Sequence, residues 1–319
     1  MEHVTVLAGG VGGAKLAHGF ALCQPEIHLT VIVNTGDDFD HFGLRICPDL
    51  DTVCYTLAGL ANPHTGWGRK EETFEVLRLV GELGGPTWFR LGDKDLATHL
   101  ERTRRLREGQ RLSQVVESFC SRWGITARVL PMSDDPVRTM VHTLEYGWLG
   151  FQDYFVRCAC QPAVKEFAFE GIEKALPAPG VLEALERSDL IVIAPSNPWV
   201  SIQPILSLKG VASLIQTKKV VAVSPIIQGQ TIKGPAAKMY REMGIEPSAL
   251  AVARQYQPYL WGFVIDELDR GLETTLKSSG IMILITQTIM HHEEDRLLLA
   301  KNILAFSKAR KLEQQRREF

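Results

Sequence analysis

The hydrophobic pattern of the chain alternates between short, fully apolar runs and longer segments with helical character. The apolar runs are rich in Val, Ile and Leu and fall at Val4–Ala8, Leu29–Val33, Leu190–Ala194, Val220–Ser224, Phe263–Ile265 and Ile281–Ile285. Such runs are typical of strands buried on both faces of a parallel sheet. Helical stretches separate them, at Ala14–Cys23, Ile202–Leu208, Ala236–Met243 and Glu267–Ser278. This alternation predicts an α/β fold with a doubly wound, mostly parallel, Rossmann-like sheet.

The middle of the chain has a different pattern. Amphipathic segments occur at Glu72–Leu83, Asp95–Leu106 and Leu112–Trp123, and residues 127–170 contain extended pieces. We therefore predict a core formed by residues 1–60 and 176–319, with a helix-rich inserted subdomain at 61–175 that covers one edge of the sheet. The last segment, Glu293–Phe319, predicts a long helix that ends in a solvated run of charges.

Composition narrows the class of protein. Of 319 residues, 45% are hydrophobic and 23% charged, and the formal net charge is −2. These values fit a globular protein and argue against a general nucleic-acid binder or a polybasic membrane surface. No apolar run approaches the roughly 20 residues of a membrane span, and the N-terminus does not resemble a signal peptide. The six cysteines form no C-x-x-C pair, so we expect reduced thiols in a cytoplasmic protein.

A glycine-rich turn follows the first predicted strand. The turn fits neither the Walker pattern nor the G-x-G-x-x-G dinucleotide pattern. It contains Gly9, Gly10, Gly12, Gly13 and Lys15. Glycine residues at this position still let backbone amides at a helix N-terminus approach an anion. The turn therefore predicts a phosphate or nucleotide site, and a tight strand–helix turn without a ligand is the alternative.

Four carboxylates lie in two short clusters shortly after the second predicted strand. Asp37 and Asp38 follow Asn34 in the first cluster, and Asp49 and Asp51 precede an apparent helix in the second. Carboxylates beside a phosphate-binding turn can hold Mg²⁺ together with water and substrate phosphates. The alternative is that Asp49 or Asp51 only caps the helix.

Three further loops carry polar side chains. In the segment Leu91–His99, helical spacing puts Asp95, Thr98 and His99 on one face, and Lys94 and Arg102 are candidates for an anionic or polar ligand. A capped, solvated helix start explains the same segment without a ligand. Two other loops follow adjacent predicted strands, so we expect them to form walls of one pocket. These loops contain Ser196, Asn197, Ser224 and Pro225.

Taken together, these motifs resemble the 2-phospho-L-lactate transferase family of coenzyme F420 biosynthesis, known as CofD, with a bacterial branch called FbiA. The matching stretches are Val4–Lys15, Asn34–Asp38, Ile46–Tyr55, Gly66–Gly68, Leu91–His99, Leu130–Asp135, Ala194–Ile202 and Ser224–Ile227. The resemblance implies a Mg²⁺-dependent enzyme that moves a phospholactyl or phosphoenolpyruvyl group from a guanosine diphosphate-linked donor to the deazaflavin FO. GMP would leave as the phosphodiester of (dehydro)coenzyme F420-0 forms. The family further implies a homodimer without nucleic-acid or membrane partners.

The resemblance also implies roles for individual residues. The donor phosphates would bind at the glycine turn, through Gly9, Gly10, Gly12, Gly13 and Lys15. The catalytic residues would be Asp37 and Asp51, which would also hold the cation with Asp38 and Asp49 in support. The guanosine end would lie against Ser196, Asn197, Ser224 and Pro225.

On the acceptor side, one residue has two competing roles and another differs from the family pattern. Asp51 and Lys94 match positions that the family uses for FO, so Asp51 has two competing roles, and Trp67 is a candidate for stacking on the deazaflavin. Family members commonly have Arg where this chain has Lys94. Lysine offers a point charge instead of a planar fork, so the contacts with FO are expected to differ.

Two other functions fit parts of the pattern. One is an enzyme that binds NAD or a nucleotide sugar at the same edge of the sheet, although the broken glycine fingerprint and the number of aspartates weigh against it. The other is a nucleotide-binding regulatory protein with the same fold and no transfer activity. The retention of Asp37, Asp38, Asp49 and Asp51 favours catalysis over regulation.

Overall fold

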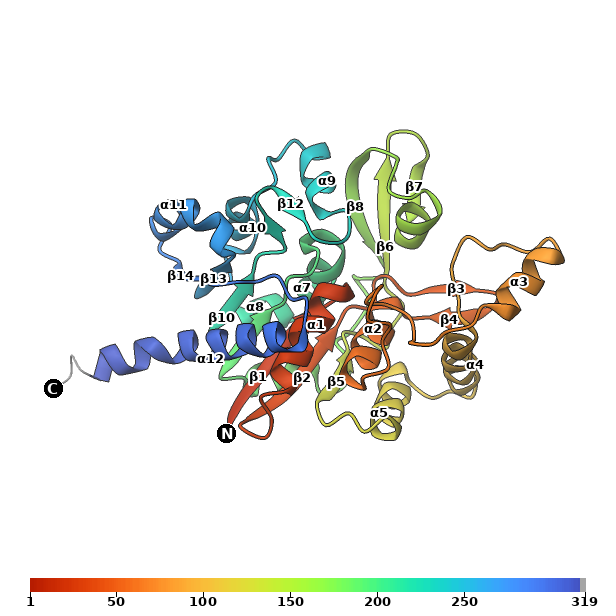
Figure 1. The fold of residues 1–319 in the computed structure, drawn as a ribbon, viewed down its shortest axis with the longest axis horizontal. Coiled ribbons are helices and arrows are strands. Elements are labelled where there is room, and N and C mark those ends of the chain that lie inside the picture. The colour runs from red at the N-terminus through yellow and green to blue at the C-terminus, as the bar shows by residue number, and fades with distance from the viewer. Residues whose placement is uncertain (316–319) are drawn as a thin grey trace.

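The central feature of the computed structural model, which describes residues 1–315, is a seven-stranded parallel sheet (Figure 1). Its strands are β1 (Glu2–Ala8), β2 (Ile27–Val33), β5 (Arg128–Pro131), β9 (Leu190–Ile193), β10 (Val220–Val223), β13 (Gly262–Ile265) and β14 (Met282–Ile285). They lie in the order β14-β13-β10-β9-β1-β2-β5, with parallel pairing throughout. This order is that of a Rossmann-like sheet, and it reverses between β1 and β9. The predicted fold class is therefore confirmed.

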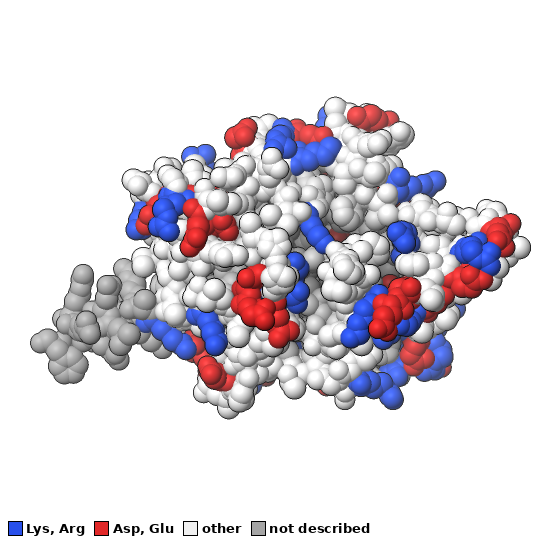
Figure 2. Space-filling model, in the orientation of Figure 1, with Lys and Arg blue, Asp and Glu red and all other residues white. Residues whose placement is uncertain are grey.

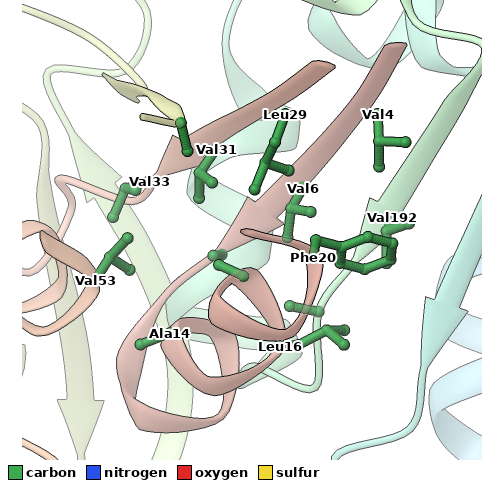
Figure 3. Packing of buried hydrophobic residues seen from close by; sticks show 14 of the residues in the cluster. Val4, Val6, Ala14, Leu16, Phe20, Leu29, Val31, Val33, Val53 and Val192 are labelled. Atoms are coloured by element: carbon green, nitrogen blue, oxygen red, sulfur yellow. The ribbon is translucent and has the colours of Figure 1, made fainter. Parts of the chain in front are cut away.

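Alternate residues of the strands supply two hydrophobic layers. Val4 and Val6 of β1 point to one face and Leu7 points to the other. The first layer packs against α1 (Gly10–Ala21), α2 (Pro48–Leu57), α5 (Leu112–Arg122) and α12 (Glu293–Gln315). Figure 3 shows part of it, with Leu16 and Phe20 of α1 beneath Val6.

The second layer packs against another set of helices. They are α6 (Val181–Arg187), α7 (Gln203–Ser207), α8 (Val211–Ile215), α9 (Ala236–Glu242), α10 (Ala249–Tyr256) and α11 (Glu273–Lys277). Both faces of the sheet are thus covered, which explains why its strands are almost continuous apolar runs.

Several predicted helices differ in their bounds. The first helix begins at Gly10 and not at Ala14, so the glycine run is itself the first helical turn. The stretch Ile202–Leu208 is divided between a π-helical turn, η2 (Pro198–Ile202), and α7. The stretch Glu267–Ser278 is divided between a 3₁₀ segment, η3 (Glu267–Leu272), and α11.

The chain between β2 and β9 forms two bodies beside the sheet. The first contains the hairpin β3 (Phe39–His41) and β4 (Leu44–Ile46), followed by α2, α3 (Glu75–Glu82), α4 (Asp93–Arg107) and α5. The second is an antiparallel sheet of β6 (Arg138–Thr143), β7 (Gly147–Gly150) and β8 (Val164–Glu170), with a π-helical turn, η1 (Asp153–Arg157). The range 61–175 thus contains β5, a strand of the main sheet, and the division into core and insertion stays a prediction.

Two further features belong to the C-terminal half of the chain. A short hairpin of β11 (Ile226–Ile227) and β12 (Gln230–Thr231) follows β10, and α12 starts beside α1 and projects beyond the rest of the molecule (Figure 1). The predicted last helix, Glu293–Phe319, is found as far as Gln315, and its residues 316–319 lie outside the described part of the chain. Within residues 1–315, no helix combines the length and apolarity that crossing a membrane requires.

Candidate active site

A cavity of about 680 Å³ opens at the point where the strand order reverses. The core contributes the start of α1, the start of α2, the Asp37 loop and the loop after β9 to its walls. Further walls come from segments 65–68, 88–90, 151–156 and 233–235 and from Asp95 and His99 of α4. Ligands of open α/β sheets bind in this position, beyond the carboxyl ends of the strands.

The glycine turn is fixed against the loop after β9. Gly9 donates its amide to Ser196 Oγ at 3.1 Å, and Ser196 Oγ donates to the Gly9 carbonyl at 2.8 Å. A side chain at Gly12 would collide with the carbonyl oxygen of Pro195. Only glycine therefore allows the start of α1 to lie this close to the neighbouring loop. Gly13 packs behind the lining, beside Ala8 and Ser196.

Asp49 joins the glycine turn to the Asn34 loop. Its Oδ1 accepts the Gly10 amide at 2.7 Å, and its Oδ2 accepts Asn34 Nδ2 at 2.9 Å. Asn34 Nδ2 also lies 3.3 Å from the carbonyl oxygen of Val200, at η2. Burial raises the pKa of Asp49 to about 6 in spite of these hydrogen bonds.

Asp37 lines the cavity beside Asp49. Within residues 1–315, one of its carboxylate oxygens lacks a hydrogen-bond donor, and so does one oxygen of Asp38, which lies outside the lining. The side chain of Asp37 is buried, and its oxygen without a donor is the Oδ1 atom. Burial, and then the nearby charge of Asp49, raises the pKa of Asp37 well above its ordinary value. A buried carboxylate oxygen without a donor is a ligand that a hard divalent cation can use. The donor set at this position therefore fits Mg²⁺.

Asp38 is buried outside the lining of the cavity, against Cys47. Burial raises the pKa of Asp38 to about 7, and a hydrogen bond with Cys47 partly opposes this effect. The structure thus brings Asp37, Asp49 and Asp51 to the cavity and leaves Asp38 one layer behind.

Asp51 is held by a buried arginine. Arg102 of α4 donates Nη1 to Asp51 Oδ2 at 3.1 Å and Nη2 to Asp51 Oδ1, so the guanidinium grips both carboxylate oxygens. Arg102 also donates to the carbonyl of Arg45 at 3.2 Å, and only 1% of its surface is exposed. A two-point pair of this kind fixes the orientation of the carboxylate and offsets its charge.

The same wall contains a second carboxylate and a histidine. His99 Nε2 lies 3.3 Å from Asp95 Oδ1, and His99 Nδ1 lies 3.7 Å from Asp51 Oδ2. Tyr55 donates its hydroxyl to Asp95 at 2.6 Å. Ligand atoms of Asp51, Asp95 and His99 all lie within 4.8 Å of one another, which is a spacing that metals accept. The guanidinium on Asp51 already supplies the positive charge there, so this trio suits a metal less well than Asp37 does.

The pairing of Arg102 with Asp51 is the main feature of the site that the sequence did not predict. The spacing of Asp95, His99 and Arg102 at i, i+4 and i+7 places all three on one face of α4. This spacing is a signal for a shared face, and the structure confirms that Thr98 and His99 are buried there. It does not reveal that the face meets Asp51, because that contact joins residues 51 positions apart.

The structure does not bring Lys94 to the cavity. Its ammonium donates to the Lys70 carbonyl at 3.2 Å and lies 3.8 Å from Glu71, outside the described lining of both cavities. Its backbone amide donates to Glu72 at 2.5 Å. The neighbouring Asp93 caps α3 through the amides of residues 75 and 76. This segment therefore fixes α3 against α4.

A smaller cavity of about 120 Å³ adjoins the first. Lys15, Ser224 and Pro225 line it, together with residues 288–291. Lys15 donates to the carbonyl of Met290 at 2.5 Å, and burial followed by the charges of Arg296 and Lys233 lowers the pKa of Lys15. The two cavities share Val11, Gly12, Pro195, Asn197, Lys233 and Gly234 in their walls. The predicted guanosine residues thus lie at the junction or in the smaller cavity, except Ser196, which lines the larger one.

Aromatic rings form much of the remaining wall of the larger cavity. Trp67 is already expected there from the sequence. The structure adds five further aromatic residues, which come from three distant segments. They are Tyr55, Trp88, Phe89, Phe151 and Phe155. Phe151 and Phe155 lie parallel, with ring centroids 5.4 Å apart. Flat apolar walls with a polar floor suit a planar heterocycle.

A family model and individual relatives of known name indicate the same protein family. Residues 4–287 match the family described as 2-phospho-L-lactate transferase CofD. A phosphoenolpyruvate transferase of Streptomyces griseus is 42% identical over 308 residues, which cover 94% of this chain and 97% of that protein. A 2-phospho-L-lactate transferase of Methanosarcina mazei is 40% identical over 299 residues, which cover 94% and 98%.

A solved structure agrees at the level of the fold. A UPF0052 family protein from Bacillus halodurans superimposes with a TM-score of 0.60 at 15% identity, covering 90% of this chain and 93% of that one. Because the identity is low, this likeness supports the α/β fold alone. The family match and the two relatives span nearly the whole sequence, and the chain therefore belongs to the CofD family of 2-phospho-L-lactate transferases.

Proposed function

We propose that this chain transfers a 2-phospholactyl or phosphoenolpyruvyl group from a guanosine diphosphate-linked donor to the terminal hydroxyl of FO, with release of GMP. The observation that carries the proposal is the meeting of Asp37, Asp49 and the start of α1 in one cavity at the switch point of a CofD-family sheet. Relatives named for each three-carbon acid are 42% and 40% identical to the chain. Identity therefore does not choose between lactate and enolpyruvate.

The donor is assigned to the junction of the two cavities. Its phosphates would lie at the N-terminus of α1, where the helix dipole and the backbone amides that follow Gly10 favour anions, the Gly10 amide itself being bound to Asp49. The guanosine would extend into the smaller cavity, past Asn197 toward Ser224 and Pro225. This placement puts the scissile phosphate beside Asp37 and Asp49.

Mg²⁺ is assigned to Asp37, with Asp49 beside it and Asp38 behind. When bound, the cation would offset the charge on the transferred phosphoryl group and on the departing GMP. Asp49 holds the glycine turn and Asn34, so it positions the phosphate site as well. Asp51 is committed to Arg102, which argues for a role in shaping the acceptor wall over direct metal binding.

The acceptor is assigned to the aromatic part of the larger cavity. The deazaflavin ring would pack against Trp67, Trp88 and Phe151, and its ribityl chain would extend toward the glycine turn. The terminal hydroxyl oxygen then forms a bond to the phosphorus that bears the three-carbon acid, and the bond from this phosphorus to GMP breaks. The hydroxyl proton is released, and Asp37 lines the cavity where it could accept this proton. The homodimer stays a prediction from the family resemblance.

The first test is direct turnover. The purified protein with Mg²⁺, FO and each guanosine diphosphate-linked acid is expected to give the corresponding phosphodiester and one GMP per product, measured by mass spectrometry. NAD serves as the control nucleotide and should neither bind nor react. Thermal stabilisation by guanosine nucleotides without any product from either donor would instead favour the regulatory alternative.

Removal of the free carboxylate tests the metal assignment. Asp37→Asn is expected to lower kcat about 100-fold or more at saturating Mg²⁺, because charge neutralisation at the phosphate is lost. The melting temperature should not fall, since the Oδ1 atom lacks a hydrogen-bond partner in residues 1–315. Asp40→Asn is the matched control, because Asp40 is exposed and pairs with Arg45 at 3.2 Å outside the cavity lining. Full activity of Asp37→Asn would remove Asp37 from the mechanism.

The raised pKa values predict how pH changes stability and metal binding. Asp49 and Asp38 have folded-state pKa values of about 6 and about 7, above the roughly 3.9 of an unfolded aspartate. Their contribution to stability is full below about pH 4 and is lost as the pH rises through 6 to 7. Mg²⁺ competes with protons for ionised oxygens, so it should raise the melting temperature more at pH 8 than at pH 5.5. Differential scanning fluorimetry with and without Mg²⁺ measures this difference, and an equal shift at both values would contradict it.

The buried ion pair predicts a different result for Asp51. Asp51→Asn leaves the guanidinium of Arg102 buried without its counterion and should reduce the free energy of unfolding by about 3–5 kcal/mol. Urea unfolding monitored by circular dichroism provides the measurement, with Asp37→Asn as the comparison. Wild-type stability of Asp51→Asn would show that the pair does not support the fold.

A further inference from the structure

Lys233 lies between the two cavities and has no role in the reaction proposed above. It follows the β11–β12 hairpin, in a turn that Thr231 fixes by donating its hydroxyl to the Gly234 carbonyl at 2.8 Å. Lys233 lines both cavities, so it lies where they join. The other shared residues include Val11 and Gly12, at the start of α1.

The ammonium group of Lys233 bridges the two walls of this junction. It donates to the carbonyl of Thr65 at 2.6 Å, across 168 positions in the sequence. The next residue, Gly66, lies against Val11, since a Cβ added there would meet Val11 Cγ1 at 2.6 Å. The segment 65–68 therefore crosses the glycine turn, and Lys233 connects it to the core. The partner is a neutral carbonyl, which a more strongly accepting anion can replace.

Other nearby cations are less suited to meet an anion at the junction. Arg102 is committed to Asp51, and Lys94 lies outside both cavities. Lys15 donates to Met290 and lines the smaller cavity only. Lys233 thus combines a position at the junction with a partner that carries no charge.

The charge balance of the cavity calls for such a cation. The larger cavity contains Asp37 and Asp49, both buried, and a diphosphate would add further negative charge beside them. A divalent cation held by these carboxylates has part of its charge already offset. Phosphoryl-transfer sites generally combine the metal with a lysine or arginine on the phosphates for this reason.

We propose that Lys233 binds the diphosphate of the donor, exchanging the Thr65 carbonyl for a phosphate oxygen. The inference rests on the proposed function, because it takes the donor to be a guanosine diphosphate derivative. The exchange removes the hydrogen bond between Lys233 and segment 65–68, while the packing of Gly66 against Val11 remains. Trp67 of this segment lines the larger cavity, so the hydrogen bond that the donor replaces lies beside the proposed acceptor wall.

The test compares ligands with and without phosphates. Calorimetry with Mg²⁺ should show that Lys233→Met weakens the binding of GDP by about tenfold to a hundredfold, the loss expected for one charge-assisted hydrogen bond. Binding of guanosine and of FO should change less than about threefold. Lys233→Arg should restore most of the affinity for GDP, because arginine also pairs with phosphate. Lys209→Met is the control for loss of one lysine, since Lys209 is exposed and lies outside the described lining of both cavities.

Each outcome decides a separate point. Unchanged GDP affinity in Lys233→Met would overturn the role of Lys233 and leave the proposed function intact. An equal loss of GDP, guanosine and FO binding with a lower melting temperature would overturn it too, because the residue would then be structural. Failure of the unaltered protein to bind GDP would overturn the donor assignment itself.

Discussion

The hydrogen bonds of Asp49 are the constraint on which the arrangement of the site depends. This carboxylate lies in the first turn of α2 and accepts the amide of Gly10, the first residue of α1. The positive ends of two helix dipoles therefore converge on one buried charge. Asn34 adds a second hydrogen-bond donor and connects the same carboxylate to the loop after β2. Without Asp49, the start of α1 and the Asn34 loop, which both carry candidate ligand-binding groups, would lose their common partner.

The partners of the four aspartates, more than their sequence positions, distinguish what each can do. Asp49 is satisfied by amides, and Asp51 is satisfied by a guanidinium. Asp37 and Asp38 each have one oxygen without a donor in residues 1–315, but Asp38 lies beside Cys47 behind the cavity wall, whereas Asp37 lines the cavity. A ligand or a proton acceptor needs an oxygen that the fold has not already used. Asp37 meets this requirement best, and the other three explain how the fold tolerates so much negative charge.

The sequence was sufficient to predict the fold, and it indicated which loops meet at one edge of the sheet. The apolar runs identified six of the seven strands of the main sheet, because strands buried on both faces leave a clear pattern. The other strand, Arg128–Pro131, is short and falls in a range that was assigned to the insertion. Glycine after the first strand indicated the start of α1, although the helix begins within the glycine run. Loops after adjacent parallel strands must meet at one edge, so their convergence was predictable as well.

The partners within the site were not predictable, because they depend on contacts between distant segments. The pairing of Arg102 with Asp51 requires α4 to pack across the start of α2. The rings at Trp88, Phe89 and Phe151 reach the cavity from different parts of the chain, and none of their segments has a distinctive local motif. Lys94 shows the opposite problem. Its motif matched a functional position, yet its side chain is directed to Lys70, and its role follows from tertiary geometry.

This geometry suggests how the segment around Lys94 influences the acceptor side without touching the cavity. Asp93 caps α3 through three hydrogen bonds, from Thr73, Glu75 and Val76, and the amide of Lys94 donates to Glu72. These bonds fix both ends of the stretch between Glu72 and Asp93, which carries Trp88 and Phe89 to the cavity wall. A change at this motif therefore shifts two rings at once, while the donor side remains fixed by Asp49 and Ser196. The core of the molecule thus fixes the glycine turn, where the donor phosphates are proposed to bind, and the segments outside it shape the aromatic wall proposed for the acceptor.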